Sequence, residues 1–254
     1  MQPPAIEVPM LLPVLALLLQ APTAEARLIR YPHVHGSQVA FTYLGDIWTA
    51  TSAGSDVRRL TVHTASDAYP RFSPDGKWIA FSSDRFGNFD VFIVPAEGGM
   101  PTRLTHHSAG DQVLGWTPDG TRVLFASQRG ERFGGMLYTV DLAGGMPVSA
   151  GADIGVYGSY SPDGTKLAFN RMSQVHWRKG YRRSNQRDVA VLNVRTGGFT
   201  ALTDFNGMDS WPMWGRDGFI YYVSDKDEKA TNLYRVAERG GAAERVTTFP
   251  SGDV

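Results

Sequence analysis

The stretch SPDGKWIAFSSDR, from Ser73 to Arg85, decides the fold because the chain contains it three times in similar form. A near copy, TPDGTRVLFASQR, begins at Thr117, and SPDGTKLAFNR begins at Ser161, so each copy starts 44 residues after the one before. Pro presets the backbone for the second position of a tight turn, Asp bonds to its own backbone, and Gly takes the left-handed conformation. The phrase is therefore a hairpin turn, and its Asp is a turn residue rather than a catalytic acid.

The rest of each period also repeats. After the turn, apolar and polar residues alternate, and this period of two predicts a β-strand. Each unit continues with a further strand that ends at a glycine turn and then with a short outer strand. The further strands are NFDVFIVPAEGG (88–99), MLYTVDLAGG (136–145), DVAVLNVRTGG (188–198) and NLYRVAERGG (232–241), and the outer strands are VRRLT (57–61), PTRLT (101–105), FTALT (199–203) and AERVT (243–247). With the strand ahead of the turn, each unit holds four strands.

Four antiparallel strands in every period of about 40–50 residues are typical of a β-propeller blade. We therefore predict an all-β fold, a β-propeller of four-stranded antiparallel blades, over residues 27–254. The segment FPSGDV matches the beginning of an earlier unit and predicts the entry to a sixth. The predicted blades are 28–61, 62–105, 106–150, 151–203 and 204–247, followed by the start of a sixth at 248–254.

Charge and cysteine content narrow the classes of function. The 254 residues contain 25 Lys and Arg against 25 Asp and Glu, and this balance argues against a nucleic-acid partner. The chain has no cysteine, which excludes disulfides and thiolate chemistry but leaves the compartment open.

Residues 1–26 resemble a secretory signal peptide. The apolar run from Met10 to Ala21 is too short to span a bilayer, and the small-x-small site Ala24–Ala26 places cleavage before Arg27. The segment before the run carries Glu7 and no basic residue, which is unusual for such a signal. We predict an exported protein, periplasmic or extracellular, without a membrane span; the alternative is a disordered apolar tail on a cytoplasmic protein.

The search for catalytic groups is negative. The sequence has no G-x-S-x-G elbow, no H-E-x-x-H and no phosphate-binding loop. Asp84, Asn88 and Asp90 could suggest a calcium loop, but they lack the ligand ladder of an EF-hand and are interpreted as a hairpin loop. We therefore expect no catalytic residue, no cofactor and no metal site in this chain.

One segment breaks the repeat. The fourth unit is lengthened by RMSQVHWRKGYRRSNQRD (171–188), in which six basic residues precede the first acidic one. Such a loop can meet a peptide carboxylate, an acidic partner domain or, with less support, a nucleic acid. The alternative is a solvated loop whose aromatic residues pack on the blade. The candidate binding residues are Trp177, Arg178, Lys179, Tyr181, Arg182 and Arg183.

The chain resembles the first propeller of tricorn-type serine peptidases over residues 28–254. The S/T-P-D-G turn is weak evidence, because TolB-like propellers and those of prolyl-oligopeptidase-like enzymes share it. The opening RYPHVHGSQVAFTYLGDIW (30–48) and the HWRKGYRR loop (176–183) are more specific. Other matching segments are FDVFIVPAEGGMPTRLTHH (89–107), DQVLGWTPDGTRVLF (111–125), GSYSPDGTKLAFN (158–170) and MDSWPMWGRDGFIYYVSD (208–225).

The resemblance implies a six-bladed propeller that is followed by a second propeller, a helical segment, a PDZ-like domain and a serine-protease core. In that family the propellers gate and channel peptides, and the catalytic residues lie in the later domains, so none can be assigned here. Two features depart from the family: its loop continues with Gly-Gly after Tyr-Arg, whereas RRSN follows Tyr181, and the sixth blade is missing. With five blades of an expected six, a fragment of this kind should form an open arc whose two end faces are apolar.

The resemblance thus predicts the non-catalytic propeller of an exported tricorn-like serine peptidase. Its expected partners are a peptide or polypeptide and the downstream domains of the same chain, with a homo-oligomer also possible. Two alternatives stay open. One is a stand-alone TolB-like periplasmic protein-binding propeller, and the other is the propeller of another exported hydrolase, such as a prolyl-oligopeptidase-like or amidohydrolase fusion.

Overall fold

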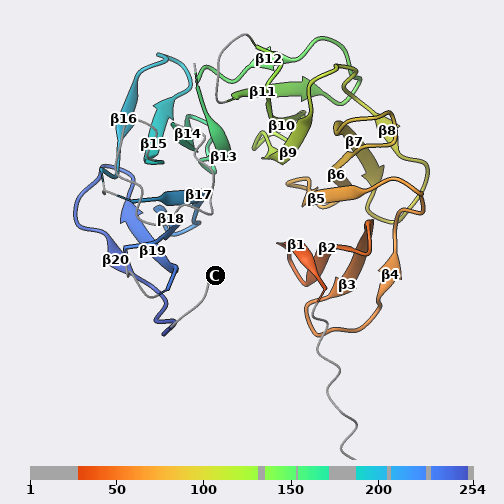
Figure 1. Cartoon of the computed structure of the whole chain (residues 1–254), viewed down its shortest axis with the longest axis horizontal. Coiled ribbons are helices and arrows are strands. Elements are labelled where there is room, and N and C mark those ends of the chain that lie inside the picture. Colours follow the sequence, from red (N-terminus) through yellow and green to blue (C-terminus); the bar gives the residue numbers. More distant parts are fainter. Residues whose placement is uncertain are drawn as a thin grey trace, which may run out of the picture.

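The computed structural model describes residues 28–130, 135–152, 154–171, 187–204, 207–226 and 230–250. Within these ranges every regular element is a β-strand, and no helix is present that could cross a membrane. The strands form five four-stranded antiparallel sheets, each built from strands consecutive in the chain (Figure 1). This arrangement confirms the predicted all-β propeller of four-stranded blades.

The five blades have the following strands. Blade 1 holds β1 (Arg30–His35), β2 (Gln38–Tyr43), β3 (Asp46–Thr51) and β4 (Arg58–Arg59); blade 2 holds β5 (Asp67–Phe72), β6 (Trp78–Ser83), β7 (Asp90–Pro95) and β8 (Thr102–Arg103); blade 3 holds β9 (Asp111–Trp116), β10 (Arg122–Ser127), β11 (Met136–Asp141) and β12 (Val148–Ser149); blade 4 holds β13 (Val156–Tyr160), β14 (Lys166–Asn170), β15 (Val189–Asn193) and β16 (Phe199–Ala201); blade 5 holds β17 (Asp209–Trp214), β18 (Phe219–Ser224), β19 (Asn232–Ala237) and β20 (Glu244–Arg245).

The repeated turn has the predicted chemistry. Gly76 closes the first copy with a φ of 73°, in the left-handed region that favours glycine. The Ser73 hydroxyl donates to Asp75 Oδ1 at 2.6 Å, and the same oxygen accepts the Lys77 amide at 3.1 Å. The hydrogen bond from Ser73 lowers the pKa of Asp75. The Asp is therefore a turn residue, and the other two copies repeat this geometry.

The outer RLT strands are attached through their threonines. Thr61 Oγ1 accepts the Ile47 amide at 2.9 Å, and Thr105 Oγ1 accepts the Val91 amide at the same distance. Thr203 and Thr247 make the equivalent bonds in blades 4 and 5. The threonine that ends the outer segment in these four units therefore has a structural role. Its hydroxyl accepts a hydrogen bond from a buried backbone N–H that would otherwise be unpaired.

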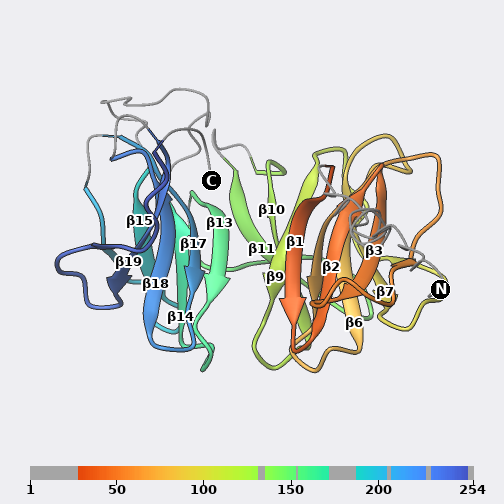
Figure 2. The same cartoon turned by 90° about the horizontal axis from the view of Figure 1, so that it is seen from below.

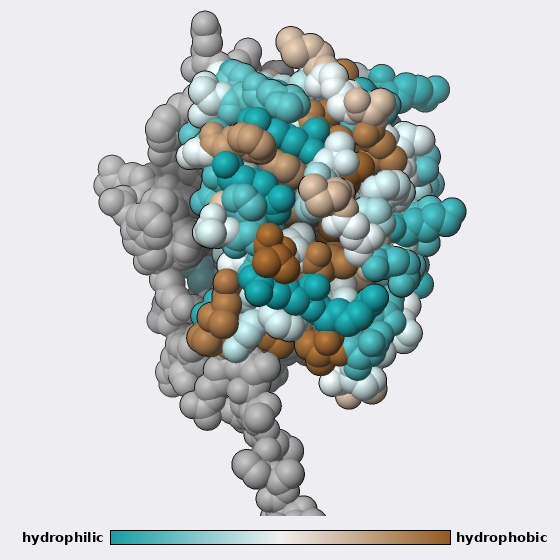
Figure 3. Space-filling view, turned by 90° about the vertical axis from the view of Figure 1, so that its right-hand side faces the viewer, coloured by the Kyte–Doolittle hydropathy of each residue, from teal (hydrophilic) through white to brown (hydrophobic). Residues whose placement is uncertain are grey.

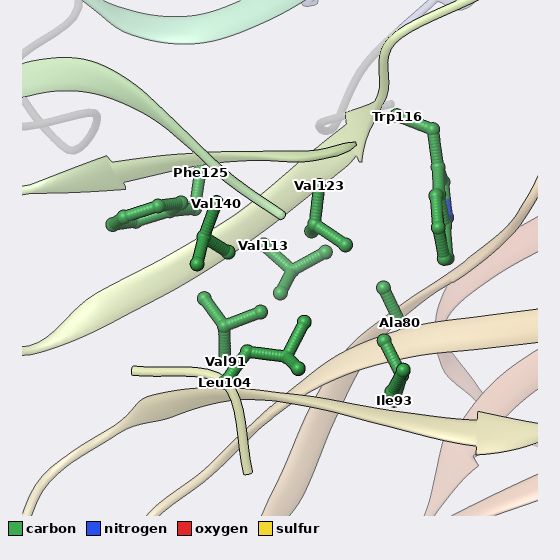
Figure 4. Close-up of a cluster of buried hydrophobic side chains, with 9 residues drawn as sticks. All are labelled: Ala80, Val91, Ile93, Leu104, Val113, Trp116, Val123, Phe125 and Val140. Atoms are coloured by element: carbon green, nitrogen blue, oxygen red, sulfur yellow. The ribbon is translucent and has the colours of Figure 1, made fainter. Parts of the chain in front are cut away.

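Neighbouring blades pack by one rule. The aromatic face of each blade lies on the face of the preceding blade that carries smaller side chains. Phe81 of blade 2 shares a buried cluster with Ala40 of blade 1. Figure 4 shows the next interface, where Phe125 of blade 3 lies on the side of Val91 of blade 2 and Trp116 of blade 3 lies on the side of Ala80. Each blade therefore depends on its neighbour to bury its apolar face, as in other repeat proteins.

The blades form an open arc, as expected. Contacts join the innermost strands β1 to β5, β5 to β9, β9 to β13 and β13 to β17. No comparable contact joins β17 to β1 in the described part of the chain, and Figures 1 and 2 show the two end blades apart. The order of blades around the centre therefore follows the order of the repeats in the sequence.

The free face of blade 5 carries an ion pair. At the free face of blade 5, Arg235 stands where blade 2 has Ile93, and its Nη2 lies 2.7 Å from Glu244 Oε2. The Tyr221 hydroxyl donates to Asp217 on the same blade at 2.8 Å. Charged side chains therefore form part of the free face of blade 5. On the outer rim of the right-hand blades, Figure 3 shows apolar side chains in small areas separated by polar ones.

In each of three blades, the first residue of the innermost strand forms a buried ion pair with a cation that follows the second strand. In blade 2, Arg85 Nη2 lies 2.8 Å from Asp67 Oδ2, and its guanidinium lies 5.0 Å from the Phe92 ring centroid. In blade 5 the cation is Lys226, whose Nζ is 3.8 Å from Asp209 Oδ2. Neither carboxyl oxygen of Asp209 makes a hydrogen bond of ordinary geometry with the described residues, and burial raises its pKa.

Substituting Lys226→Arg is expected to stabilise the protein by about 1 kcal/mol. The planar guanidinium can donate two bonds to the buried carboxylate of Asp209, which an ammonium at this distance does not do. The gain should shrink as pH falls through the raised pKa of Asp209, because the protonated carboxyl no longer needs a cation. Urea unfolding measures the change, and Arg85→Lys in blade 2 is the matched reverse substitution. If Lys226→Arg and Arg85→Lys changed the free energy of unfolding equally and in the same direction, this explanation would be contradicted.

Candidate functional site

The six residues predicted to bind a partner lie outside the described residues. Trp177, Arg178, Lys179, Tyr181, Arg182 and Arg183 all belong to the segment 172–186. Their role as a binding loop therefore stays a prediction. The segment is followed by Arg187, which is described and which lies beside a second group of side chains near the centre of the arc.

That second group is created by irregularities in the innermost strands. In four blades an aromatic residue of this strand has a left-handed backbone: Tyr31, Tyr69, Tyr157 and Trp211 have φ values of 53°, 57°, 54° and 53°. Each lies within a register shift between the innermost strand and its partner. A bulge of this kind re-aims a side chain, and a non-glycine residue in this region costs about 1 kcal/mol or more.

These four residues, here called the axial aromatic cluster, form two contacting pairs. The ring centroids of Tyr31 and Tyr69 are 4.1 Å apart, and those of Tyr157 and Trp211 are 5.5 Å apart. Burial raises the pKa of Tyr69, and its hydrogen bond with Tyr31 and the charges of the nearby Tyr31 and Tyr157 hydroxyls add to this effect. Tyr69 belongs to blade 2 and Tyr157 to blade 4, and the two hydroxyls are close enough for Tyr157 to affect the pKa of Tyr69. Figure 1 shows that their strands, β5 and β13, both lie on the inner side of the arc.

Two arginines border this cluster. Arg71 lies two residues after Tyr69 on β5, and its Nε donates to the Leu114 carbonyl of blade 3 at 3.0 Å. Burial lowers the pKa of Arg71 to about 10. On blade 1, burial lowers the pKa of His33 to about 4, with a further contribution from the charge of Arg71. The His33 ring is therefore neutral at pH 7, and its Nδ1 accepts the Phe72 amide at 3.1 Å.

Arg187 borders the cluster on the other side. Its side chain is buried, its Nη1 donates to Ser210 Oγ at 3.1 Å, and its guanidinium lies 5.0 Å from the Tyr157 ring centroid. Burial lowers the pKa of Arg187, and the Tyr157 hydroxyl opposes that shift. Arg187, the first described residue after the segment 172–186, therefore contacts the axial aromatic cluster.

This cluster was not predicted from the sequence, although the sequence carries a signal for it. The pairs Tyr31-Pro32, Tyr69-Pro70 and Trp211-Pro212 share one position of the innermost strand, and Tyr157-Gly158 occupies it in blade 4. An aromatic residue before proline or glycine, repeated at the period of the fold, indicates a bulge. Blade 3 departs from the pattern with Val113-Leu114.

No group of His, Asp and Glu in the described parts of the chain could hold a metal ion. The loose calcium-like set of the second blade is used in protein contacts instead. Asp84 accepts the Ser66 amide at 2.7 Å, Asn88 donates to the His107 carbonyl at 3.0 Å, and Asp90 pairs with Arg103 at 2.6 Å. These contacts agree with their interpretation as hairpin residues.

Two solved structures with similar folds cover most of the chain. The crystal structure of the tricorn protease superposes with a TM-score of 0.74 at 24% identity, and the match covers 87% of this chain and 22% of that one. The putative TolB from Agrobacterium tumefaciens superposes with a TM-score of 0.71 at 22% identity, covering 86% of this chain and 80% of that one. At these identities the likeness shows the fold alone.

Sequence relatives include peptidases much longer than the aligned segments. Tricorn protease homolog 1 of Streptomyces coelicolor is 42% identical over 78 residues, which are 31% of this chain and 7% of the relative. The uncharacterized peptidase YuxL of Bacillus subtilis is 33% identical over 94 residues, or 37% of this chain and 14% of that protein. The family model described as the tricorn protease N-terminal beta propeller domain matches residues 26–254. The chain therefore belongs to the family of tricorn protease N-terminal β-propeller domains.

Proposed function

We propose that this chain is the non-catalytic propeller of an exported tricorn-like serine peptidase. In this proposal it binds and gates polypeptide substrates and contacts the catalytic domains of the same protein. The family match over residues 26–254 is the observation that carries the proposal. The sequence supports it further, because neither a G-x-S-x-G elbow nor an H-E-x-x-H motif occurs in it. Export rests on the signal-like segment 1–26, and N-terminal sequencing that begins at Arg27 would support it.

A second candidate is a stand-alone protein-binding propeller. The similarity to the putative TolB structure, 80% of which is covered, favours this function. The third possibility, the propeller of another exported hydrolase, is supported by the similarity to YuxL. The coding sequence beyond Val254 discriminates among the three. A PDZ-like segment and a serine-peptidase core support the tricorn-like enzyme, an early stop supports the binding module, and an α/β-hydrolase elbow or metal-ligand histidines support the third.

The basic loop supplies the functional test. In the full-length protein, replacement of Arg178, Lys179, Arg182 and Arg183 with Gln should weaken binding of an acidic peptide by about tenfold at low salt. The loss should shrink as salt rises, because exposed charges are screened over about 10 Å at 0.1 M ionic strength. Fluorescence anisotropy of a labelled peptide measures the affinity, and cleavage of fluorogenic peptides measures the activity.

The matched control replaces four exposed cations of the blades with Gln. These are Lys77, Arg195, Arg216 and Arg239. Because the control removes the same net charge, it separates a local site from general electrostatic attraction. If both variants lost the same affinity for the acidic peptide, the loop would be a solvated surface loop without a binding role. A full-length protein that neither binds nor cleaves peptides would contradict the proposed function itself.

A further inference from the structure

Arg71 is a partly buried cation whose charge no nearby carboxylate balances. Its Nε donates to the Leu114 carbonyl at 3.0 Å, and its Nη1 donates to the Pro70 carbonyl at 2.8 Å. In the described parts of the chain, no Asp or Glu lies within ion-pair distance of its guanidinium. Arg85, Arg103 and Arg129, by contrast, each pair with a buried Asp.

A guanidinium carries five N–H donors, so Arg71 keeps donors beyond the two that the carbonyls engage. Its removal from bulk water has a cost that an ion pair normally offsets. The absence of such a pair at Arg71, and its presence at the other three arginines, indicates that the balancing anion comes from outside the described residues.

The aromatic side chains near Arg71 indicate a second property of the ligand, an apolar or aromatic group. Tyr69 lies two residues before it on β5, and Tyr31 contacts Tyr69 from blade 1. Tyr31 is 42% exposed and Trp211 is 38% exposed, so both aromatic pairs present ring surface to a ligand. Exposed aromatic rings held by strained backbone are typical of a contact site, because ordinary core packing would bury them.

We propose that Arg71 and the axial aromatic cluster bind a polypeptide segment in which an acidic side chain stands next to an aromatic one. The inference rests on the proposed function, since it names the polypeptide that the propeller would select. The carboxylate accepts the free N–H donors of Arg71, and the aromatic ring of the ligand packs on Tyr31 and Tyr69 or on Tyr157 and Trp211.

The surrounding charges favour this ligand over others. An aromatic cluster alone would suit a cation, but Arg71 and Arg187 border it and would repel one. Tyr69 bears no negative charge at neutral pH, since burial raises its pKa, and His33 is neutral there. A free chain terminus offers a carboxylate to Arg71 but no ring to the aromatic cluster. An acidic side chain beside an aromatic one can contact both.

The test uses the full-length protein and peptides blocked at both ends. Calorimetry compares acetyl-Gly-Gly-Glu-Phe-Gly-Gly-amide with the Gln-Phe and Glu-Ala versions of the same peptide. We expect the Glu-Phe peptide to bind at least about tenfold more tightly than either, because each change removes one of the two contacts. Arg71→Gln should abolish the preference for Glu over Gln while preserving the preference for Phe over Ala. Arg195→Gln, on the exposed rim of blade 4, should change neither.

Arg71→Lys is the second variant, in case the Gln substitution prevents folding. It keeps the charge but loses the planar fork, so the preference for Glu should fall several-fold without vanishing. Equal binding of the Glu-Phe and Gln-Phe peptides to the unsubstituted protein would overturn the inference. Equally tight binding of a Gln-Ala peptide with a free carboxyl terminus would also overturn it, because a chain end would then suffice. Peptide binding in either case would leave the proposed function intact, whereas no binding of any peptide would contradict both.

Discussion

Replacing Phe125 with Ala is expected to lower the free energy of unfolding by about 3–5 kcal/mol. The Phe125 side chain is fully buried between blades 2 and 3, in the cluster that contains Val91 and Val113. Its ring stacks on Tyr138 with centroids 5.8 Å apart. Truncation therefore leaves a cavity between blades 2 and 3. The residues that line this cavity belong to two separate sheets, so neither sheet alone can rearrange to fill it. Urea unfolding followed by circular dichroism measures the loss.

The matched control is Met146→Ala, on the turn that follows the third strand of the same blade. Met146 is 89% exposed, so its truncation should change stability by less than about 0.5 kcal/mol. If Phe125→Ala were as mild as the control, blades 2 and 3 would not depend on each other for stability. That result would contradict the packing rule described for neighbouring blades.

Replacing Arg129 with Met is expected to cost about 3–5 kcal/mol. Its guanidinium pairs with Asp111, whose side chain is fully buried, and it lies 5.1 Å from the Phe125 ring centroid. Met keeps most of the apolar contact, so the loss reports mainly the carboxylate that remains buried without a cation. The comparison substitution is Lys77→Met, because Lys77 pairs with Asp75 at the surface and both side chains are largely exposed. It should cost less than about 1 kcal/mol.

A double substitution isolates the cause of this loss. Asp111→Asn combined with Arg129→Met removes the buried charge together with its partner, so more than half of the lost stability should return. If the double variant were as unstable as Arg129→Met alone, packing of the arginine stem rather than the unpaired charge would explain the cost. The same comparison can be made at Asp67 and Arg85 of blade 2, where Arg85 Nη2 contacts both carboxylate oxygens.

Local sequence was enough to predict the blades. The S/T-P-D-G phrase specifies a turn through the backbone preferences of three residues, and the alternation after it specifies a strand. The ion pair on the free face of blade 5 was not predicted, because the repeat pattern treats all units alike. The residue that decides this face is Arg235, which replaces the aliphatic residue found at the same place in blade 2.

Candidate sites were harder to predict for a physical reason. The basic loop could be selected from sequence because its residues are adjacent in the chain, and whether it binds a partner stays a prediction. The axial aromatic cluster draws residues from four blades, and Arg71 reaches a carbonyl 43 residues away. The repeated aromatic-Pro pairs marked the bulges, but nothing in them told where the rings would point.

The sequence by itself determined the repeat, the turns, the strand order within each blade and the order of the blades, because each depends on residues close together in the chain. Only the tertiary structure decided which side chains meet at the centre of the arc and which cation lacks a carboxylate. Those properties depend on distances between blades, which arise when each blade buries its apolar face on the one before it.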